Sequence, residues 1–286
     1  MSIQETKFKA IADAIRAKTG ETGTIVANDF ATKIAAIPTG VAKPSWVQGT
    51  MPINTNWKSV CYGDGKFVAV AYNSAIAAYS TDGIDWTQVT LPTTTNWTSV
   101  CYGGGKFVAV SSRRGDSAYS TDGINWTSTY MSGIRDWNSV CYGDGKFVAV
   151  CSSSSLPAYS RNGIDWGTGS LPVSENWQSV CYGNGKFVAV AYDSNIAAYS
   201  TDGIDWTQVT LPTSANWRSV CYGNGKFVAV VNDSNVAAYS TDGINWTQTT
   251  LPSATWYSVC YGDGKFVAVS YGSIAAYLKD YFDEWA

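Results

Sequence analysis

The sequence predicts an all-β protein: a six-bladed β-propeller of four-stranded antiparallel blades with a small N-terminal helical appendage. The first observation is a repeat, whose copies begin at Trp57, Trp97, Trp137, Trp177, Trp217 and Trp256. Successive copies are therefore 40 residues apart four times and then 39. A period of that size is typical of propellers and solenoids. The second observation is that each copy holds short apolar and aromatic segments between glycine-rich turns, without helical periodicity, which favours the propeller.

The first repeat shows the elements expected of one blade. They are, in order, strands at 57–62, 66–70, 76–79 and 84–91, with turns at 63–65 and 80–83. The Gly-Asp-Gly turn suits a two-residue hairpin, because Asp-Gly tolerates the positive φ angles that such turns need. The fourth strand is rich in threonine and ends at Pro92. Both features suit an outer edge strand that must not pair with other chains.

Closure of the ring depends on a segment that precedes the first repeat. A fourth strand follows the first five copies only. Residues 46–52 (WVQGTMP) align with residues 86–92 (WTQVTLP), and both segments begin eleven residues before a repeat tryptophan. We therefore expect Trp46–Met51 to be the outer strand of the last blade. Asp280–Trp285 imitates the start of a fourth strand and competes for the same place.

The chain divides into four expected parts. Residues 1–37 form a helical attachment or oligomerisation module, in which Phe8, Ile11 and Ile15 follow a helical period. Residues 38–45 are a linker, residues 46–277 the six-bladed propeller, and residues 278–286 a C-terminal tail. Two short helices bury little surface alone, so the module is expected to associate with a partner or with further copies of itself.

Composition limits the functional classes. The chain has 286 residues, a net charge of −3 and no histidine. No nucleic-acid partner, membrane insertion, signal peptide, metal site or cofactor is expected. Six of the seven cysteines occupy one repeat position and are separated by whole blades, so free thiols rather than disulfides are predicted.

The second turn of each repeat carries a motif with a known relative. Residues 80–86 read Ser-Thr-Asp-Gly-Ile-Asp-Trp, and the pattern returns at 120–126, 200–206 and 240–246, with Asn162 in place of the aspartate at 160–166. This resembles the Asp-box of sialidase-like propellers, one residue shorter than usual. The resemblance implies a structural role, in which the serine and aspartate bond the turn and the tryptophan packs between sheets. Such propellers include both enzymes and lectins, so the motif does not give the function.

The N-terminal segment has a second resemblance. Ile11–Gly20 (IADAIRAKTG), continuing to Ile37, is similar to a helical module of tail and fibre proteins in phages and prophages of Gram-positive bacteria. The resemblance implies a protein of the virion tail or of a tail-like particle, made in the bacterial cytoplasm. It also implies that residues 1–37 bind other tail proteins or further copies of the chain.

A catalytic role is not expected from the residues. A sialidase-like hydrolase would need an arginine cluster and a tyrosine–glutamate pair. After the N-terminal module, the only glutamates are Glu175 and Glu284, and no such pair is evident around Arg113, Arg114 and Arg135. The sequence therefore predicts that the protein is not an enzyme.

Binding residues are expected where the repeats differ. The turns between the second and third strands diverge, whereas the other set of turns hardly changes, and variable loops on a rigid scaffold commonly carry specificity. Tyrosine beside amides and carboxylates suits sugar, because the ring stacks on C–H faces while the polar groups bond hydroxyls. The predicted ligand-binding residues are Tyr72, Asn73, Tyr192, Asp193, Asn195, Asn232, Asp233 and Tyr271.

The resulting functional prediction is a non-catalytic, lectin-like propeller that recognises glycans on the host cell surface. Two alternatives remain open: a purely structural tail or scaffold protein, and an Asp-box glycosidase.

Overall fold

The structure, a computed structural model, describes residues 50–262, 264–271 and 275–279. The chain separates into two compact units, Met1–Gln48 and Gly49–Ala286, and the described residues belong to the second. All regular structure in the described ranges is β-strand. The predicted helical module, the linker, residues 46–49 of the expected outer strand and the segment from 280 onward lie outside these ranges. No helix of the described residues could span a membrane.

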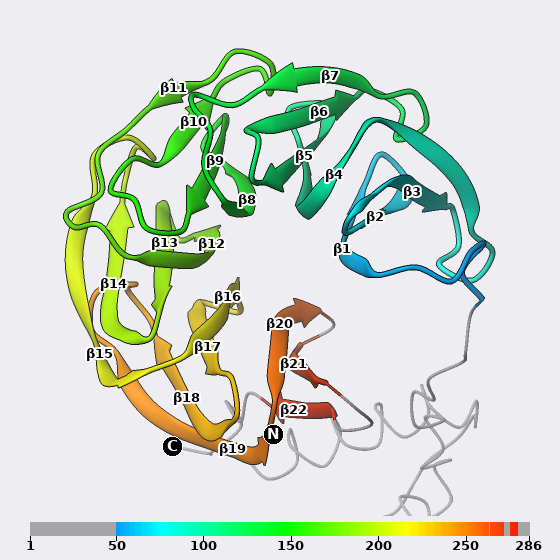
Figure 1. Cartoon of the computed structure of the whole chain (residues 1–286). Coiled ribbons are helices and arrows are strands. Elements are labelled where there is room, and N and C mark those ends of the chain that lie inside the picture. The colour runs from blue at the N-terminus through cyan, green and yellow to red at the C-terminus, as the bar shows by residue number, and fades with distance from the viewer. Residues whose placement is uncertain (1–49, 263, 272–274, 280–286) are drawn as a thin grey trace, which may run out of the picture. The chain divides into compact units, whose positions relative to one another are not determined.

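Five antiparallel sheets form a ring, with the first strand of each repeat on the inside (Figure 1). The first sheet has seven strands: β1 (Trp57–Gly63), β2 (Lys66–Ala71), β3 (Ser74–Ser80), β4 (Thr87–Gly103), β5 (Lys106–Ser112), β6 (Asp116–Ser120) and β7 (Thr127–Tyr130). The second has four: β8 (Trp137–Gly143), β9 (Lys146–Cys151), β10 (Ala158–Ser160) and β11 (Gly167–Thr168). The third also has four: β12 (Asn176–Gly183), β13 (Lys186–Tyr192), β14 (Ser194–Ser200) and β15 (Thr207–Ala215). The fourth contains β16 (Trp217–Gly223), β17 (Lys226–Val231), β18 (Ser234–Ser240) and β19 (Thr247–Ala254), and the fifth only β20 (Trp256–Gly262), β21 (Lys265–Ser270) and β22 (Ala275–Lys279).

The prediction of six separate four-stranded blades is therefore wrong for the described sheets, of which only three have four strands. The first sheet is doubled because β4 continues without interruption from the first repeat into the second. Its beginning pairs with β3, at Thr90 opposite Ile76, and its end pairs with β5, at Trp97 opposite Ser111. The threonines at 93–95 favour this extended path. The last sheet lacks a fourth strand within the described residues.

The inner hairpins follow the predicted turn chemistry. In the first, Asp64 and Gly65 have φ angles of 47° and 71°, and Gly63 pairs with Lys66. Two consecutive positive φ angles define a type I′ turn, which matches the right-handed twist of the strands. The hairpin of β8 and β9 repeats this geometry at Asp144 and Gly145.

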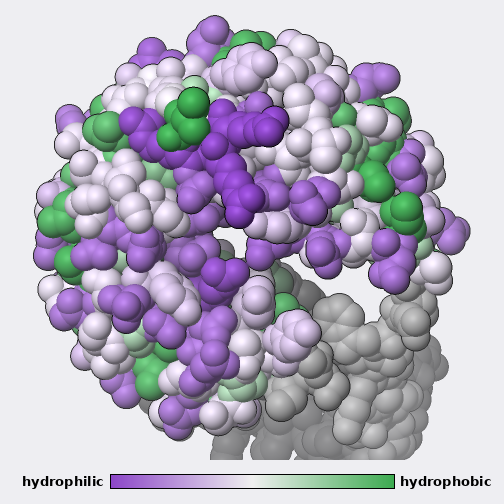
Figure 2. Space-filling view, in the orientation of Figure 1, coloured by the Kyte–Doolittle hydropathy of each residue, from purple (hydrophilic) through white to green (hydrophobic). Residues whose placement is uncertain are grey.

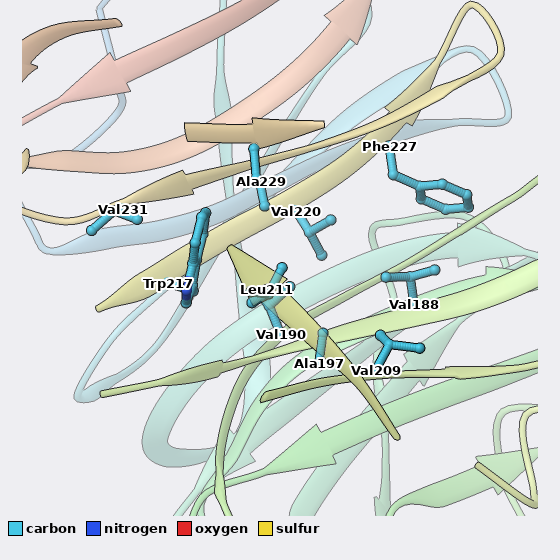
Figure 3. Packing of buried hydrophobic residues seen from close by; sticks show 11 residues of the cluster. Val188, Val190, Ala197, Val209, Leu211, Trp217, Val220, Phe227, Ala229 and Val231 are labelled. Carbon is cyan, nitrogen blue, oxygen red and sulfur yellow. The ribbon is translucent and has the colours of Figure 1, made fainter. Parts of the chain in front are cut away.

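Successive repeats are joined by one recurring interface. The Ser59 hydroxyl accepts a hydrogen bond from the Val100 backbone N–H at 3.1 Å, and the same bond joins each following pair of repeats. Each interface also buries a cluster of apolar residues. Figure 3 shows the cluster around Trp217, in which Leu211 and Phe227 are also fully buried. Burial of large apolar side chains in this way is the main source of stability in the ring.

The last and first repeats do not share this interface. The innermost strands lie side by side from β1 through to β20, but β20 and β1 make no comparable contact. Val60 is 59% exposed, whereas Val100, at the same repeat position, is 4% exposed. Tyr62 and Tyr277 are also largely exposed. The ring of described sheets therefore has one unfilled interface, which is called the seam below.

The second turn of each repeat is held by its serine and acid. Ser80 Oγ accepts from the Gly83 N–H at 2.8 Å, and Asp82 Oδ1 accepts from the N–H groups of Ile84 and Asp85 at 2.8 and 3.0 Å. In the third repeat, Asn162 Oδ1 accepts the corresponding two bonds, both at 2.9 Å. These contacts fix the chain as it turns toward the outer strand.

All seven cysteines are free. Burial raises the pKa of the repeat thiols, that of Cys61 to about 12. Burial also raises the pKa values of the thiols of Cys101, Cys141 and Cys181. The thiols are therefore packing groups that stay protonated at neutral pH.

Candidate functional site

The predicted binding residues lie in tight turns or at the ends of the strands beside them. The turn between β2 and β3 consists of Tyr72 and Asn73, and that between β13 and β14 is centred on Asp193. Asn73, Asp193 and Asp233 have positive φ angles of 53°, 57° and 52°. Asparagine and aspartate adopt this conformation more readily than most other residues. These side chains are exposed and could reach a ligand, but their presence is also explained by the turn geometry.

The turns are anchored to the segment that precedes each repeat tryptophan. The Tyr72 N–H donates to the Asn56 carbonyl at 2.8 Å, and the Tyr271 N–H donates to the Thr255 carbonyl at 2.8 Å. Thr255 also donates its hydroxyl to the carboxylate of Asp233 in the neighbouring repeat. The backbone of these turns is therefore rigid, which suits side chains that present a surface.

The structure does not gather the predicted residues into one pocket. Tyr72 and Asn73 belong to the first sheet, Tyr192, Asp193 and Asn195 to the third, Asn232 and Asp233 to the fourth, and Tyr271 to the last. None of them lines the cavity at Arg113 and Arg135, the cavity at Arg161, or the cavity between Val228 and Tyr277. Tyr72, Tyr192 and Asn232 are half-buried, whereas the others are exposed. The arrangement consists of separate, shallow surface positions.

One of these residues has an aromatic neighbour that sequence reasoning did not assign to the site. The rings of Tyr257 and Tyr271 have centroids 6.3 Å apart and are inclined by 39°. Tyr257 is 42% exposed and Tyr271 is 82% exposed. Two exposed rings at this spacing form a small apolar platform on an otherwise polar surface.

Two cations flank this platform. Lys58 Nζ lies 5.6 Å and Arg218 Cζ lies 4.9 Å from the centroid of the Tyr257 ring. Burial and the nearby charge of Arg218 lower the pKa of Lys58. Neither cation forms an ion pair with a described carboxylate. The four residues Lys58, Arg218, Tyr257 and Tyr271 are called the tyrosine platform below.

The tyrosine platform could have been suspected from one signal. The residue after each repeat tryptophan varies, and Lys58, Arg218 and Tyr257 all occupy that position. The variation is visible in the sequence, but the meeting of three such residues is not. It arises because the innermost strands of the fifth, sixth and first repeats converge on the centre of the ring (Figure 1).

The platform offers an aromatic face beside two cationic hydrogen-bond donors. A tyrosine face stacks on the C–H face of a pyranose, and ammonium and guanidinium groups donate hydrogen bonds to hydroxyl or acidic oxygens. Among the described residues, no group of three or more potential ligands is arranged to hold a metal ion.

No family model and no curated protein matches the chain. Virginiamycin B lyase from Staphylococcus aureus is similar in structure, with 12% identity, a TM-score of 0.68 and coverage of 80% of this chain and 86% of the lyase. YCF48 from Cyanidioschyzon merolae has 16% identity, a TM-score of 0.61 and coverage of 79% and 83%.

These neighbours correct the prediction that the protein is not an enzyme. The same fold occurs in a lyase, including a catalytically inactive histidine-to-alanine variant solved with quinupristin, so the architecture gives no ground for excluding catalysis. The present chain has no histidine to compare with the one replaced in that variant. Another neighbour, YCF48 bound to D1 peptide, is a complex with a peptide. Identities this low establish the fold alone: the described part of the chain is a β-propeller-like ring of antiparallel sheets.

Proposed function

We propose that this chain is a carbohydrate-binding propeller of a phage tail or tail-like particle, and that it recognises glycans on the host cell surface. The observation that carries the proposal is the tyrosine platform, in which Tyr271 is 82% exposed beside Tyr257. Two exposed aromatic rings side by side form an apolar patch, and such patches often mark ligand contacts.

The separate predicted positions fit the same role. Tyr72 and Tyr192 occur in turns of almost identical sequence, so they are proposed to bind the same sugar. A single neutral sugar in a shallow site binds weakly, because few atoms are engaged and polar groups must be desolvated. Several sites on one ring increase the apparent affinity for a surface that displays repeated glycans.

The place of the protein in a particle rests on its N-terminal resemblance. We propose that residues 1–37 attach the ring to other tail proteins or to further copies of the chain, after synthesis in the bacterial cytoplasm. Residues 1–37 lie outside the described ranges, so this part of the proposal depends on the sequence.

We also propose that residues 46–51 complete the sheet of the last repeat. Thr50 forms an isolated parallel bridge with Asp85. Ser170, in the outer strand segment of the third repeat, has the same relation to Asp205 of the fourth. Thr50 and Ser170 both stand four residues after an aligned tryptophan. Thr50 therefore pairs with the first repeat in the same way that the outer segment of the third repeat pairs with the fourth.

The functional proposal is tested by binding to a glycan array and to intact bacterial cells. Replacing Tyr257 and Tyr271 together by alanine should reduce glycan binding at least tenfold, as expected when the main apolar contacts of a small ligand are lost (about 1.4 kcal/mol per tenfold). Tyr130→Ala is the matched control, because Tyr130 is 68% exposed on β7, away from the platform. Unchanged binding in the double variant, or an equal loss in the control, would contradict the proposal.

A further inference from the structure

A second, chemically different site lies between the second and third repeats. It is an open cavity of about 330 Å³, lined by Arg113, Ile134, Arg135, Asp136, Ser152, Ser153 and Ser154. The lining comes from the turn between β5 and β6, from the segment before β8, and from the segment between β9 and β10. Figure 2 shows strongly hydrophilic residues gathered on this face of the ring.

The first sign of a built site is the position of Arg135. Its guanidinium donates to the Ser132 carbonyl and lies 5.8 Å from the centroid of the Trp137 ring. It also covers Gly133, where a Cβ would lie 2.5 Å from Arg135 Nη1. Gly133 has a φ of 116°, which few other residues adopt. The guanidinium is thus held in place before any ligand arrives, so little side-chain entropy is lost on binding.

The second sign is the backbone at Arg113, which has a φ of 90°. The corresponding turn positions in three other repeats hold Asn73, Asp193 and Asp233, residues suited to positive φ. An arginine has no such preference, and a bulky residue in this region is strained. The chain therefore keeps a guanidinium at a turn position where asparagine would be more stable.

The third sign is the segment before Trp137, which departs from the repeat. Other repeat tryptophans donate their indole N–H to the carbonyl four residues earlier, as Trp97 does to Thr93 at 3.2 Å. The buried Trp137 N–H has no partner. In this repeat Arg135 packs over Gly133 and bonds the Ser132 carbonyl, and the usual indole bond is absent. The loss of a bond that other repeats keep suggests that the segment has a different role.

The polar groups of the cavity are complementary to an acidic sugar. Neither Arg113 nor Arg135 forms an ion pair with a described carboxylate. Ser152 Oγ accepts from Asn138 Nδ2 at 2.7 Å and keeps its own proton to donate. The exposed Asp136 carboxylate can accept only, which suits a sugar hydroxyl and disfavours a bare anion close to it.

We infer that this cavity binds a saccharide that carries a carboxylate or a phosphate. The oxyanion would lie between Arg113 and Arg135, where guanidinium groups give strong, directional hydrogen bonds. The sugar hydroxyls would bond Ser152 and Asp136. The inference rests on the proposed glycan-binding function and adds that this site, unlike the tyrosine platform, selects for negative charge.

The test is a titration of the full chain, followed by NMR, with glucuronic acid, glucose 6-phosphate, glucose and inorganic phosphate. At least one acidic sugar should bind about tenfold more tightly than glucose and more tightly than phosphate, with affinity that falls as salt increases. The two acidic probes separate a carboxylate ligand from a phosphate ligand. The inference would be overturned if glucose bound as tightly as the acidic sugars, or if inorganic phosphate did.

Three variants place the site. Arg135→Gln and Arg113→Asn should each weaken acidic-sugar binding about tenfold, as expected for a lost charge-assisted bond. Asparagine at 113 is compatible with a positive φ angle, as Asn73 shows at the corresponding position of the first repeat. Arg161→Gln, in a different cavity, should have no effect. If both cavity variants still bind the acidic sugar, the inference is contradicted. The proposed function is tested separately, by the loss of neutral-glycan binding in the Tyr257/Tyr271 variant.

Discussion

The ring of Tyr182 lies against the α-carbon of Gly143, so closely that a Cβ on Gly143 would fall 2.0 Å from Tyr182 Cγ. The same relation joins Gly63 to Tyr102 and recurs at every packed interface between repeats. At the seam, Gly262 has no atom within 4 Å of such a Cβ. The glycine after each repeat tyrosine is therefore needed for packing, except where the interface is missing.

This contrast predicts two different results for one substitution. Gly143→Ala should lower the free energy of unfolding by about 3 kcal/mol, because overpacking forces the Tyr182 ring out of its site. Gly262→Ala should change it by less than about 0.5 kcal/mol, as an unobstructed substitution does. Urea unfolding followed by tryptophan fluorescence measures both. Equal losses would show that the seam is packed in solution.

The turns that follow the third strands should depend more on serine than on aspartate. Ser120 is 1% exposed, and its hydroxyl accepts from the Gly123 N–H at 2.8 Å. Ser120→Ala should therefore cost about 2 kcal/mol. Asp122→Asn should cost less than about 1 kcal/mol at neutral pH, because Asn162 shows that an amide oxygen accepts the same bonds.

Acid should distinguish the two variants. Hydrogen bonds from the Asn125 backbone N–H and other donors hold the pKa of Asp122 well below its usual range. The Asp122 carboxylate therefore stabilises the fold fully above its pKa in the unfolded chain, about 4. This stabilisation is lost as the pH falls through its lower pKa in the folded state. Asp122→Asn should lose less stability on acidification than the parent. A parallel acid dependence would contradict the assigned role.

Alkali should weaken the ring through its thiols. Burial raises the folded pKa of Cys61 to about 12, and that of Cys141 is raised in the same direction. Their contribution is complete below the unfolded thiol pKa, about 8.5, and is lost as pH rises toward the folded values. Between pH 7.5 and 9.5, with reductant present, each such thiol should lower the free energy of unfolding by up to about 1.4 kcal/mol. Replacing Cys61 and Cys141 by alanine should flatten this dependence, and an unchanged slope would assign it to other groups.

The sugar sites on the turns have their own test. Tyr72→Ala combined with Tyr192→Ala should leave the fold intact, because neither residue belongs to a buried cluster. Attachment to cells or glycans should fall sharply, since two equivalent sites are removed and their avidity is lost. Circular dichroism provides the control for folding. If this variant binds as well as the parent while changes to the second turns abolish binding, the sites are on the other face.

Closure by residues 46–51 predicts which truncations matter. The chain from residue 52 onward should melt at a lower temperature than the chain from residue 46 onward, because β22 would keep an unpaired edge. Removing residues 280–286 should not lower the melting temperature. The opposite pattern would show that Asp280–Trp285 takes the place of the outer strand.

The strands and turns could be predicted because each depends on a short stretch of sequence that recurs in every repeat. Asp64-Gly65 suits a hairpin turn, as its two positive φ angles show, and Trp57 and its five counterparts mark the first strand of each repeat. The doubling of the first sheet could not be foreseen from the sequence. Thr93–Thr95 favour an extended backbone, but β4 becomes one continuous strand only because it pairs with both β3 and β5. The seam was also missed, since Val60 and Val100 have the same sequence context and differ only in what lies beside them.

The candidate sites were predicted less well, for a related reason. Tyr271 was singled out by its turn, but its neighbour Tyr257 follows a buried tryptophan and becomes a partner only when repeats converge. The cavity at Arg135 depends on one glycine, Gly133, whose backbone angle is invisible in the sequence. Local chemistry predicts an isolated side chain, whereas a site requires distances across repeats.

The sameness of the interface between repeats bears on how such a chain can evolve. Because Ser59 joins Val100 in the way that Ser179 joins Val220, any repeat can follow any other without a new contact being invented. Nearest-neighbour stability of this kind allows recombination between near-identical coding segments to add or delete whole repeats. Each event would carry its own surface turns with it, so copy number and ligand repertoire could change together in a single step.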